Sequence, residues 1–215
     1  MKISGAIPEM EGFFMFCCRR LILSVCACVV FFSVGIPDSQ AHGGPPLRLG
    51  VTADPTVSAV ARLVLVHLRE GVGFAVDWRE FPDVTALRAA FAAGRIDIAV
   101  GLTETEQLPP APLAGAPCPD ESLVLVGAGL RKSWGGEVFL LRFPFGPAPC
   151  ARPALIVARA VLEDLRFGIL GKEAGRLAAF ITRDDVAAVR AAAERGGERS
   201  ATAAARAALA AKATR

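Results

Sequence analysis

The feature that most constrains the fold is a run of alternating strand and helix patterns over residues 47–102. The run begins with a short apolar strand, LRLGV, followed by the polar turn TADP. Asp54 in this turn is a good N-cap, and Pro55 suits the first helical position. Apolar residues then recur at helical spacing until the glycines of REGVG end the helix.

Two more strands and a second helix complete the pattern. Residues 74–81 (FAVDWREF) alternate apolar and polar side chains, as a half-buried strand does. Asp83 can cap the second helix, and 95–101 (RIDIAVG) is apolar enough for a strand covered on both faces. Strand, helix, strand, helix, strand predicts a doubly wound α/β unit with a parallel sheet.

Polar side chains follow the first and third predicted strands. Thr52 and Asp54 come after the first strand, and Thr103 and Glu104 come after the third. Ligands of open α/β sheets bind beyond the carboxyl ends of the strands, so these four residues are candidate ligand-binding residues. Their two carboxylates favour a cationic or zwitterionic ligand. Trp134, in RKSWGG, is a fifth candidate because an aromatic ring can hold a cation. Each candidate also has a simpler explanation. Asp54 could serve only as a helix cap, Glu104 could be only solvated, and Trp134 could be only an exposed loop aromatic.

The sequence contains none of the common enzyme signatures. It has no glycine-rich phosphate loop after a strand, no G-x-S-x-G elbow and no H-E-x-x-H motif. It has two histidines, too few for a histidine-based metal site. The net charge of +3 is too small to indicate a nucleic-acid partner. We therefore expect a non-enzymatic protein without a cofactor or metal.

Residues 1–41 have the pattern of a signal peptide. Two arginines precede an apolar run over 21–34, which is shorter than the roughly 20 residues of a membrane span. Ser39-Gln40-Ala41 then suits cleavage by signal peptidase. Translation could begin at Met10 or Met15. The pattern predicts a periplasmic or secreted protein, and an uncleaved membrane anchor is the alternative.

Two cysteines, Cys118 and Cys150, follow the predicted cleavage site. They could form a disulfide in an oxidising compartment or remain as two free thiols. Neither belongs to a CxxC motif, and no further cysteine after residue 41 could complete a zinc site with them.

The rest of the chain divides by composition. A proline-rich stretch follows the third strand, and we predict a strand at 122–130 (SLVLVGAGL), another in GGEVFLLRF, and helices from 154 to the end. Thr182 and Asp185 resemble a capping box. The domain prediction is a first α/β lobe at 42–106, a short second lobe at 107–172, and C-terminal helices at 173–215 that pack back on the first lobe.

These residues resemble the type 2 periplasmic substrate-binding proteins. The likeness is to the glycine betaine/choline (osmoprotectant) binding proteins of ABC importers, and it rests on GFAV at 73–76 and GRIDI at 94–98. It covers 47–106 and, more loosely, 173–211. The resemblance implies a monomer with two α/β lobes that close on a small solute, a quaternary amine or an amino-acid-like molecule. The solute would then pass to a membrane permease of an ABC importer.

Two rival functions remain. The second lobe is shorter than is usual in that family, so the chain could be a degenerate envelope sensor or scaffold without transport. An enzyme on the same fold is the other rival, because the first strand also looks similar to porphyrin-pathway deaminases. The signal sequence and the cysteine positions count against that enzyme.

Overall fold

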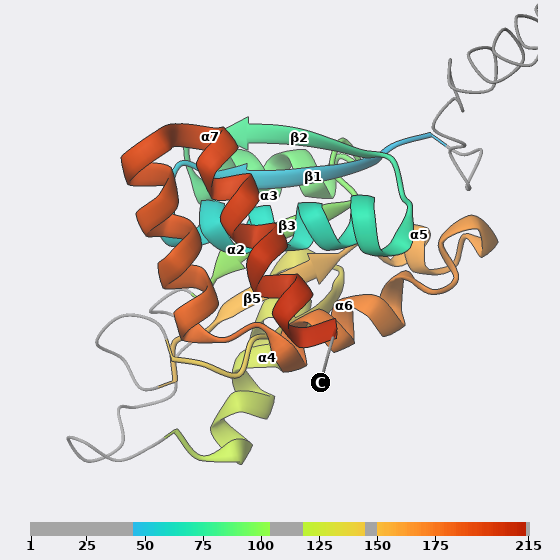
Figure 1. Cartoon of the computed structure of the whole chain (residues 1–215). Helices are drawn as coiled ribbons and strands as arrows, with labels where there is room; N and C mark the ends of the chain where they lie inside the picture. Colours follow the sequence, from blue (N-terminus) through green and yellow to red (C-terminus); the bar gives the residue numbers. More distant parts are fainter. Residues whose placement is uncertain (1–44, 104–117, 145–149, 214–215) are drawn as a thin grey trace, which may run out of the picture. The chain divides into compact units, whose positions relative to one another are not determined.

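The computed structural model describes residues 45–103, 118–144 and 150–213, which form one five-stranded mixed sheet (Figure 1). Its strands are β1 (Leu47–Thr52), β2 (Val76–Phe81), β3 (Ile98–Leu102), β4 (Glu137–Leu140) and β5 (Pro153–Val157). They lie in the order β2-β1-β3-β5-β4. β1 pairs in parallel with β2 and β3, whereas β5 is antiparallel to both β3 and β4. The α/β class predicted from the sequence is therefore correct, with one antiparallel strand inside the sheet.

Helices cover both faces of this sheet. The described helices are α2 (Pro55–Val66), the π-helical turn η1 (His67–Val72), α3 (Val84–Ala92), α4 (Asp120–Trp134), α5 (Arg159–Leu162), the 3-10 turn η3 (Leu165–Phe167), α6 (Leu170–Phe180) and α7 (Arg183–Ala213). Residues of α2, α6 and α7 share one apolar core with the sheet, and residues of α3 and α4 share a second core. Alternation within the strands builds both cores: Ile98 and Val100 of β3 belong to the first, and Ala99 between them belongs to the second.

The first two helices begin where the sequence predicts. Asp54 accepts hydrogen bonds from the backbone N–H groups of Thr56 and Val57, at 2.8 and 2.9 Å. Asp83 accepts one from the N–H of Ala86 at 2.7 Å. These contacts satisfy N–H groups that have no partner within a helix, so both turns after the strands are held by a carboxylate.

The predicted strand at 122–130 is instead part of helix α4. Asp120 and Glu121 stand in its first turn, Arg131 and Lys132 in its last turn, and Gly135 ends it with φ of 71°. Acidic residues at the start, basic residues at the end and a left-handed glycine all favour a helix. The valines and leucines of this stretch suggested a strand, but only its C-terminal half is buried.

β5 corrects a second element and the domain division. Residues 153–157 form a fully buried strand rather than the start of a helical region, because they fill the place between β3 and β4. Both β4 and β5 come from 107–172, the range predicted as a second lobe. Their hydrogen bonds join them to the sheet of the first lobe, so the described part of this range completes that lobe instead.

Of the C-terminal helices, α7 packs on α2, as Figure 1 shows, and α6 packs on β4 and β5. The predicted capping box is present: the Thr182 N–H donates to Asp185 Oδ2, and the Asp185 N–H donates to Thr182 Oγ1. The backbone leaves helical geometry at Gly196 and Gly197, which divides α7 into two halves. Lys212 in its last turn donates to Asp185 at 2.7 Å. The second half therefore returns to the start of the first.

A disulfide joins Cys118 and Cys150, the pairing that the sequence left open. It connects the residue just before α4 to the loop that enters β5.

Candidate ligand-binding site at the strand ends

The carboxyl ends of the three parallel strands meet at one edge of the sheet. β1 ends at Thr52, which pairs in register with Phe81 at the end of β2, and β3 ends at Leu102. β1 lies between its two partners, and the helices that follow β1 and β2 cover opposite faces. In open α/β sheets this divergence opens a crevice at the strand ends, which is where ligands bind.

A cavity of about 350 Å³ occupies this edge, and we call it the rim cavity. Its size is within the range of small-molecule sites. It contains three of the five predicted site residues, Thr52, Asp54 and Thr103, whereas Glu104 lies outside the described residues. The full lining is Thr52, Ala53, Asp54, Val57, Pro82, Asp83, Val84, Leu87, Gly101, Leu102 and Thr103.

Asp54 combines the capping role with a position at the cavity. Its Oδ1 atom accepts both capping hydrogen bonds, and Oδ2 has no hydrogen-bond partner among the described residues. The side chain is half-buried. One carboxylate oxygen therefore holds the helix, and the other is available to a ligand.

Asp83 also lines the cavity, whereas the sequence pattern predicted only a helix cap at this position. Its Oδ1 accepts the capping hydrogen bond of α3, and within the described ranges nothing bonds to its Oδ2. The rule that identified Asp54, a polar residue directly after a parallel strand, would have identified Asp83 as well. Asp83 also follows a parallel strand, so its side chain comes to the same edge.

Thr103 is a buried residue in the lining of the rim cavity. Its Oγ1 accepts a hydrogen bond from the backbone N–H of Arg152 at 3.0 Å, and its own N–H donates to the Arg152 carbonyl at 3.1 Å. These bonds continue the β3–β5 ladder past Leu102 and fix the residue. The hydroxyl proton is not used by them and can be donated to an oxygen of a ligand. Burial lowers the pKa of Arg152.

Trp134 does not belong to this site. Only 5% of its surface is exposed, and it lies in the core between α3, α4 and the sheet. Its ring packs edge-on against Phe91 at 5.7 Å, and the Arg88 guanidinium lies 5.3 Å from it. The side chain is an apolar anchor for the end of α4. Among the residues that the structure describes, none that lines the rim cavity is aromatic.

The electrostatics of the rim cavity favour positive charge. Asp54 and Asp83 contribute two negative charges, and none of the described lining residues is basic. The amino ends of α2 and α3 oppose them with about half a positive charge each. A net negative charge remains, so a cation or a zwitterion with an exposed amine fits better than an anion.

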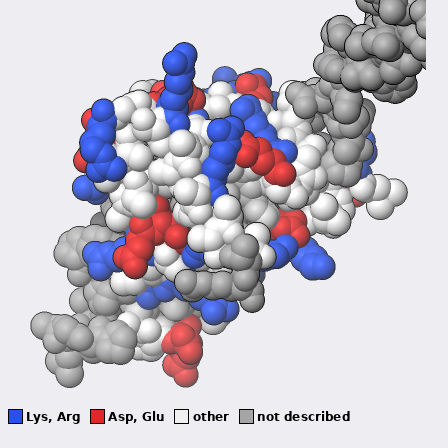
Figure 2. All heavy atoms as spheres, viewed as in Figure 1, with Lys and Arg blue, Asp and Glu red and all other residues white. Residues whose placement is uncertain are grey.

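Two kinds of feature are absent from the described residues, a metal-ligand cluster and a membrane-spanning helix. No group of three or more His, Cys, Asp or Glu residues there could hold a metal ion. Across residues 45–103, 118–144 and 150–213, none of the helices has the length and apolar character to cross a bilayer. On the face seen in Figure 2, basic and acidic side chains are interspersed.

Comparison with known proteins adds little. No protein-family model and no curated protein matches the chain. Among solved structures, the crystal structure of an OxyR mutant from Porphyromonas gingivalis is similar, with 15% sequence identity. The match covers 65% of this chain and 95% of that chain, at a TM-score of 0.32. A likeness at this level carries no argument about function. The sheet and the rim cavity are what define the molecule, as a mixed α/β protein with an acidic cavity at the strand ends.

Proposed function

We propose that this chain is an exported solute-binding protein that holds a small cationic or zwitterionic solute in the rim cavity. The observation that carries the proposal is the pair of capping carboxylates, Asp54 and Asp83, at one cavity without a basic side chain. An amine of the solute would donate to the two Oδ2 atoms. Thr52 and Thr103 would offer hydroxyls to its other polar groups.

The class of solute follows from the lining. Cation–π contact normally recognises a quaternary ammonium group, which has no N–H to donate. The lining has carboxylates and no aromatic ring, so an amine with N–H donors fits better than glycine betaine or choline. The amino-acid-like solutes of the original prediction are therefore the better candidates.

Export and transport belong to the same proposal. The signal-like pattern of residues 1–41 supports a periplasmic or secreted location, and the Cys118–Cys150 disulfide suits an oxidising compartment. The resemblance to binding proteins of ABC importers supports a membrane permease as the partner. The protein would act as a monomer without catalysis.

A second candidate function is an envelope sensor or scaffold without transport. It is favoured by the single sheet, because the described residues supply no second lobe to close over the rim cavity. An open site buries less of its ligand, so it loses part of the affinity that closure provides. The two candidates differ in how tightly a solute binds, since a sensor would bind weakly and a scaffold would not bind at all.

The test is calorimetric titration of the full chain with lysine, proline, carnitine, choline and glycine betaine. We expect binding by an amine with N–H donors, and weakening by about fivefold in Asp54→Asn and in Asp83→Asn. Asparagine caps a helix as well as aspartate does, so each variant removes the charge and keeps the helix start. Asp120→Asn is the matched control, since it lies in the first turn of α4 and not at the cavity.

Three results separate the alternatives. Equal affinity in wild type and both cap variants would place binding elsewhere and refute the site. Tight binding of choline but not lysine would refute the solute class. No binding by any of the solutes would favour the scaffold.

A further inference from the structure

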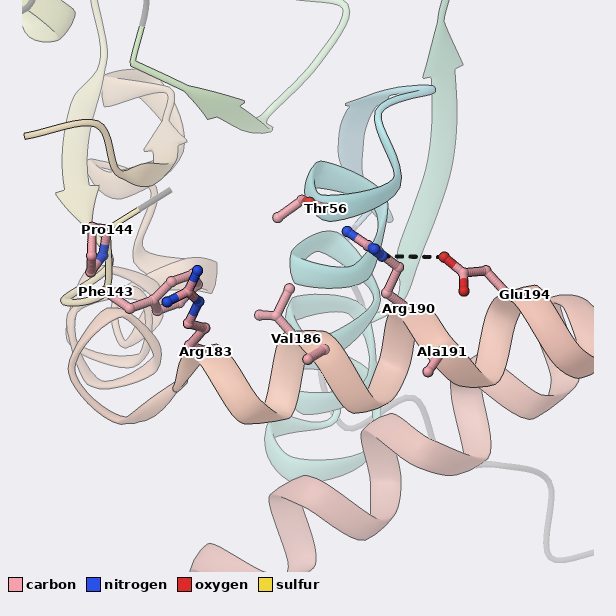
Figure 3. A pocket seen from close by; sticks show the side chains of 9 residues that line it. Thr56, Phe143, Pro144, Arg183, Val186, Arg190, Ala191 and Glu194 are labelled. Carbon is pink, nitrogen blue, oxygen red and sulfur yellow. Dashed lines mark hydrogen bonds and ion pairs between the residues drawn. The ribbon is translucent and has the colours of Figure 1, made fainter. Parts of the chain in front are cut away.

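A second cavity, of about 260 Å³, lies between the first half of α7 and the loop that follows β4 (Figure 3). We call it the α7 cavity. Thr56, in the first turn of α2, also lines it, but no residue lines both this cavity and the rim cavity. The lining is Thr56, Phe143, Pro144, Arg183, Val186, Ala187, Arg190, Ala191 and Glu194.

Much of the lining is apolar. Val186 and Thr56 are buried, and Phe143 is half-buried. Ala187 and Ala191 have short side chains, which leaves space above α7 between the longer side chains. A compact apolar group could displace water from this part of the cavity.

The polar part of the lining is basic. Arg183 and Arg190 are seven residues apart on α7, so they lie on one side of the helix, about 10 Å apart along its axis. Figure 3 shows both side chains rising from α7 toward Phe143 and Thr56. Arg190 Nε lies 3.2 Å from Glu194 Oε1, which neutralises it. Arg183 is exposed and makes no ion pair or hydrogen bond within the described residues. The lining therefore has one uncompensated positive charge.

The position of Arg183 strengthens the case for an anion. It is the first residue of α7, where the helix dipole is positive and a cation is disfavoured. The capping box of Thr182 and Asp185 accounts for the helix start without it. Asp184 and Asp185 share this first turn, and Asp185 is paired with Lys212. An anion beside Arg183 would therefore be stabilised by the guanidinium rather than by the helix end.

We propose that the α7 cavity is a second ligand site, which binds a small organic carboxylate with a compact apolar body. Arg183 donates to the carboxylate, and the apolar body lies against Phe143, Val186 and Ala191. A singly charged carboxylate matches the one uncompensated charge. A phosphate monoester carries nearly two charges at pH 7, which this lining would leave partly unpaired.

The test uses the full chain and three probes that differ only in their polar group: benzoate, benzyl alcohol and benzylammonium. Titration followed by calorimetry or by NMR should show saturable binding of benzoate. Benzyl alcohol should bind at least about fivefold more weakly, because it has no negative charge to form an ion pair with Arg183. Benzylammonium should bind more weakly still, because its positive charge is repelled by Arg183.

Variants at exposed positions of α7 locate the site. Arg183→Gln should weaken benzoate binding by about fivefold. Glu194→Gln should strengthen it, because this change frees Arg190 and removes a repelling charge. Arg195→Gln is the matched control: Arg195 is exposed on the same helix and outside the lining, so its variant should bind as the wild type does. Unchanged melting temperatures would show that the variants fold.

The proposal is overturned if benzoate does not bind, if benzyl alcohol binds as tightly, or if Arg183→Gln and Arg195→Gln bind equally well. Asp83→Asn serves as an independent check, because Asp83 lines the rim cavity and caps α3, which contributes no described residue to the α7 cavity, so benzoate affinity should stay unaltered.

Discussion

The Cys118–Cys150 disulfide should supply a large part of the stability of this domain. The two residues are 32 positions apart, and closing a loop of that length removes entropy from the unfolded chain. The loop-entropy relation gives about 3.7 kcal/mol at 25 °C for a loop of about 32 residues. For a domain of this size, that difference lowers the melting temperature by roughly 7–15 °C.

The experiment compares the wild-type chain with the double variant Cys118→Ser/Cys150→Ala. Alanine is used at position 150 because that side chain is buried, and a hydroxyl there would add a separate penalty. Thermal unfolding followed by circular dichroism gives the melting temperatures, and mass spectrometry after alkylation counts free thiols.

The structure also predicts which part of the domain should become less stable first when the disulfide is removed. The exposed residues Val124 and Leu125 show that the first turns of α4 have little packing of their own. The disulfide holds this end, so its removal should speed amide hydrogen exchange there before it does so in α2. A double variant that melts within about 2 °C of the wild type would refute the reasoning. Free thiols at both positions in the wild-type protein would also refute it.

Two further predictions concern packing and pH. Gly50→Ala should cost about 1–3 kcal/mol, because a Cβ there would lie 2.5 Å from a side-chain carbon of α3; Gly175→Ala, where the nearest atom is 3.7 Å away, should be neutral or stabilising. Urea unfolding measures both, and equal losses would contradict the packing argument. Burial raises the pKa of Asp185, but hydrogen bonds from Lys212 and from the N-cap of α7 outweigh it, so the pKa lies below its ordinary value of 3.8. The ionised Asp185 therefore stabilises the fold above pH 3.8, and this stabilisation is lost as pH falls through the pKa of the folded state. Asp185→Asn should lower the free energy of unfolding at pH 7, and the two proteins should become equally stable near pH 2. Asp184→Asn is the control, and a gap that stays constant with pH would contradict the assignment.

Local chemistry made the first half of the fold predictable. Asp54 and Asp83 each satisfy the amide groups of the following helix, and this interaction involves residues two or three positions away. The period of apolar residues distinguishes strand from helix in the same local way. For that reason the parallel unit, both caps and the polar edge were available from the sequence. The one site residue missed, Asp83, obeys the same rule.

Elements that depend on distant partners were not predictable in this way. The stretch 122–130 has the composition of a strand, and it is a helix because only its C-terminal half packs against the sheet. Residues 153–157 are a strand because β3 and β4 stand on either side of them. Trp134 is an anchor of the core for a similar reason, since its partners Phe91 and Arg88 come from α3.

By itself, the sequence determined the α/β class, the parallel direction of the first three strands and the polar edge at their carboxyl ends, because the alternation of strand and helix patterns and the helix caps are local features. Tertiary structure alone decided that the later strands join the same sheet, that Cys118 meets Cys150, and that Arg183 faces a cavity beside Phe143. Those outcomes depend on which segments, distant in the sequence, pack together. The free energy of that packing depends on all the partners and cannot be inferred from any short stretch of the chain.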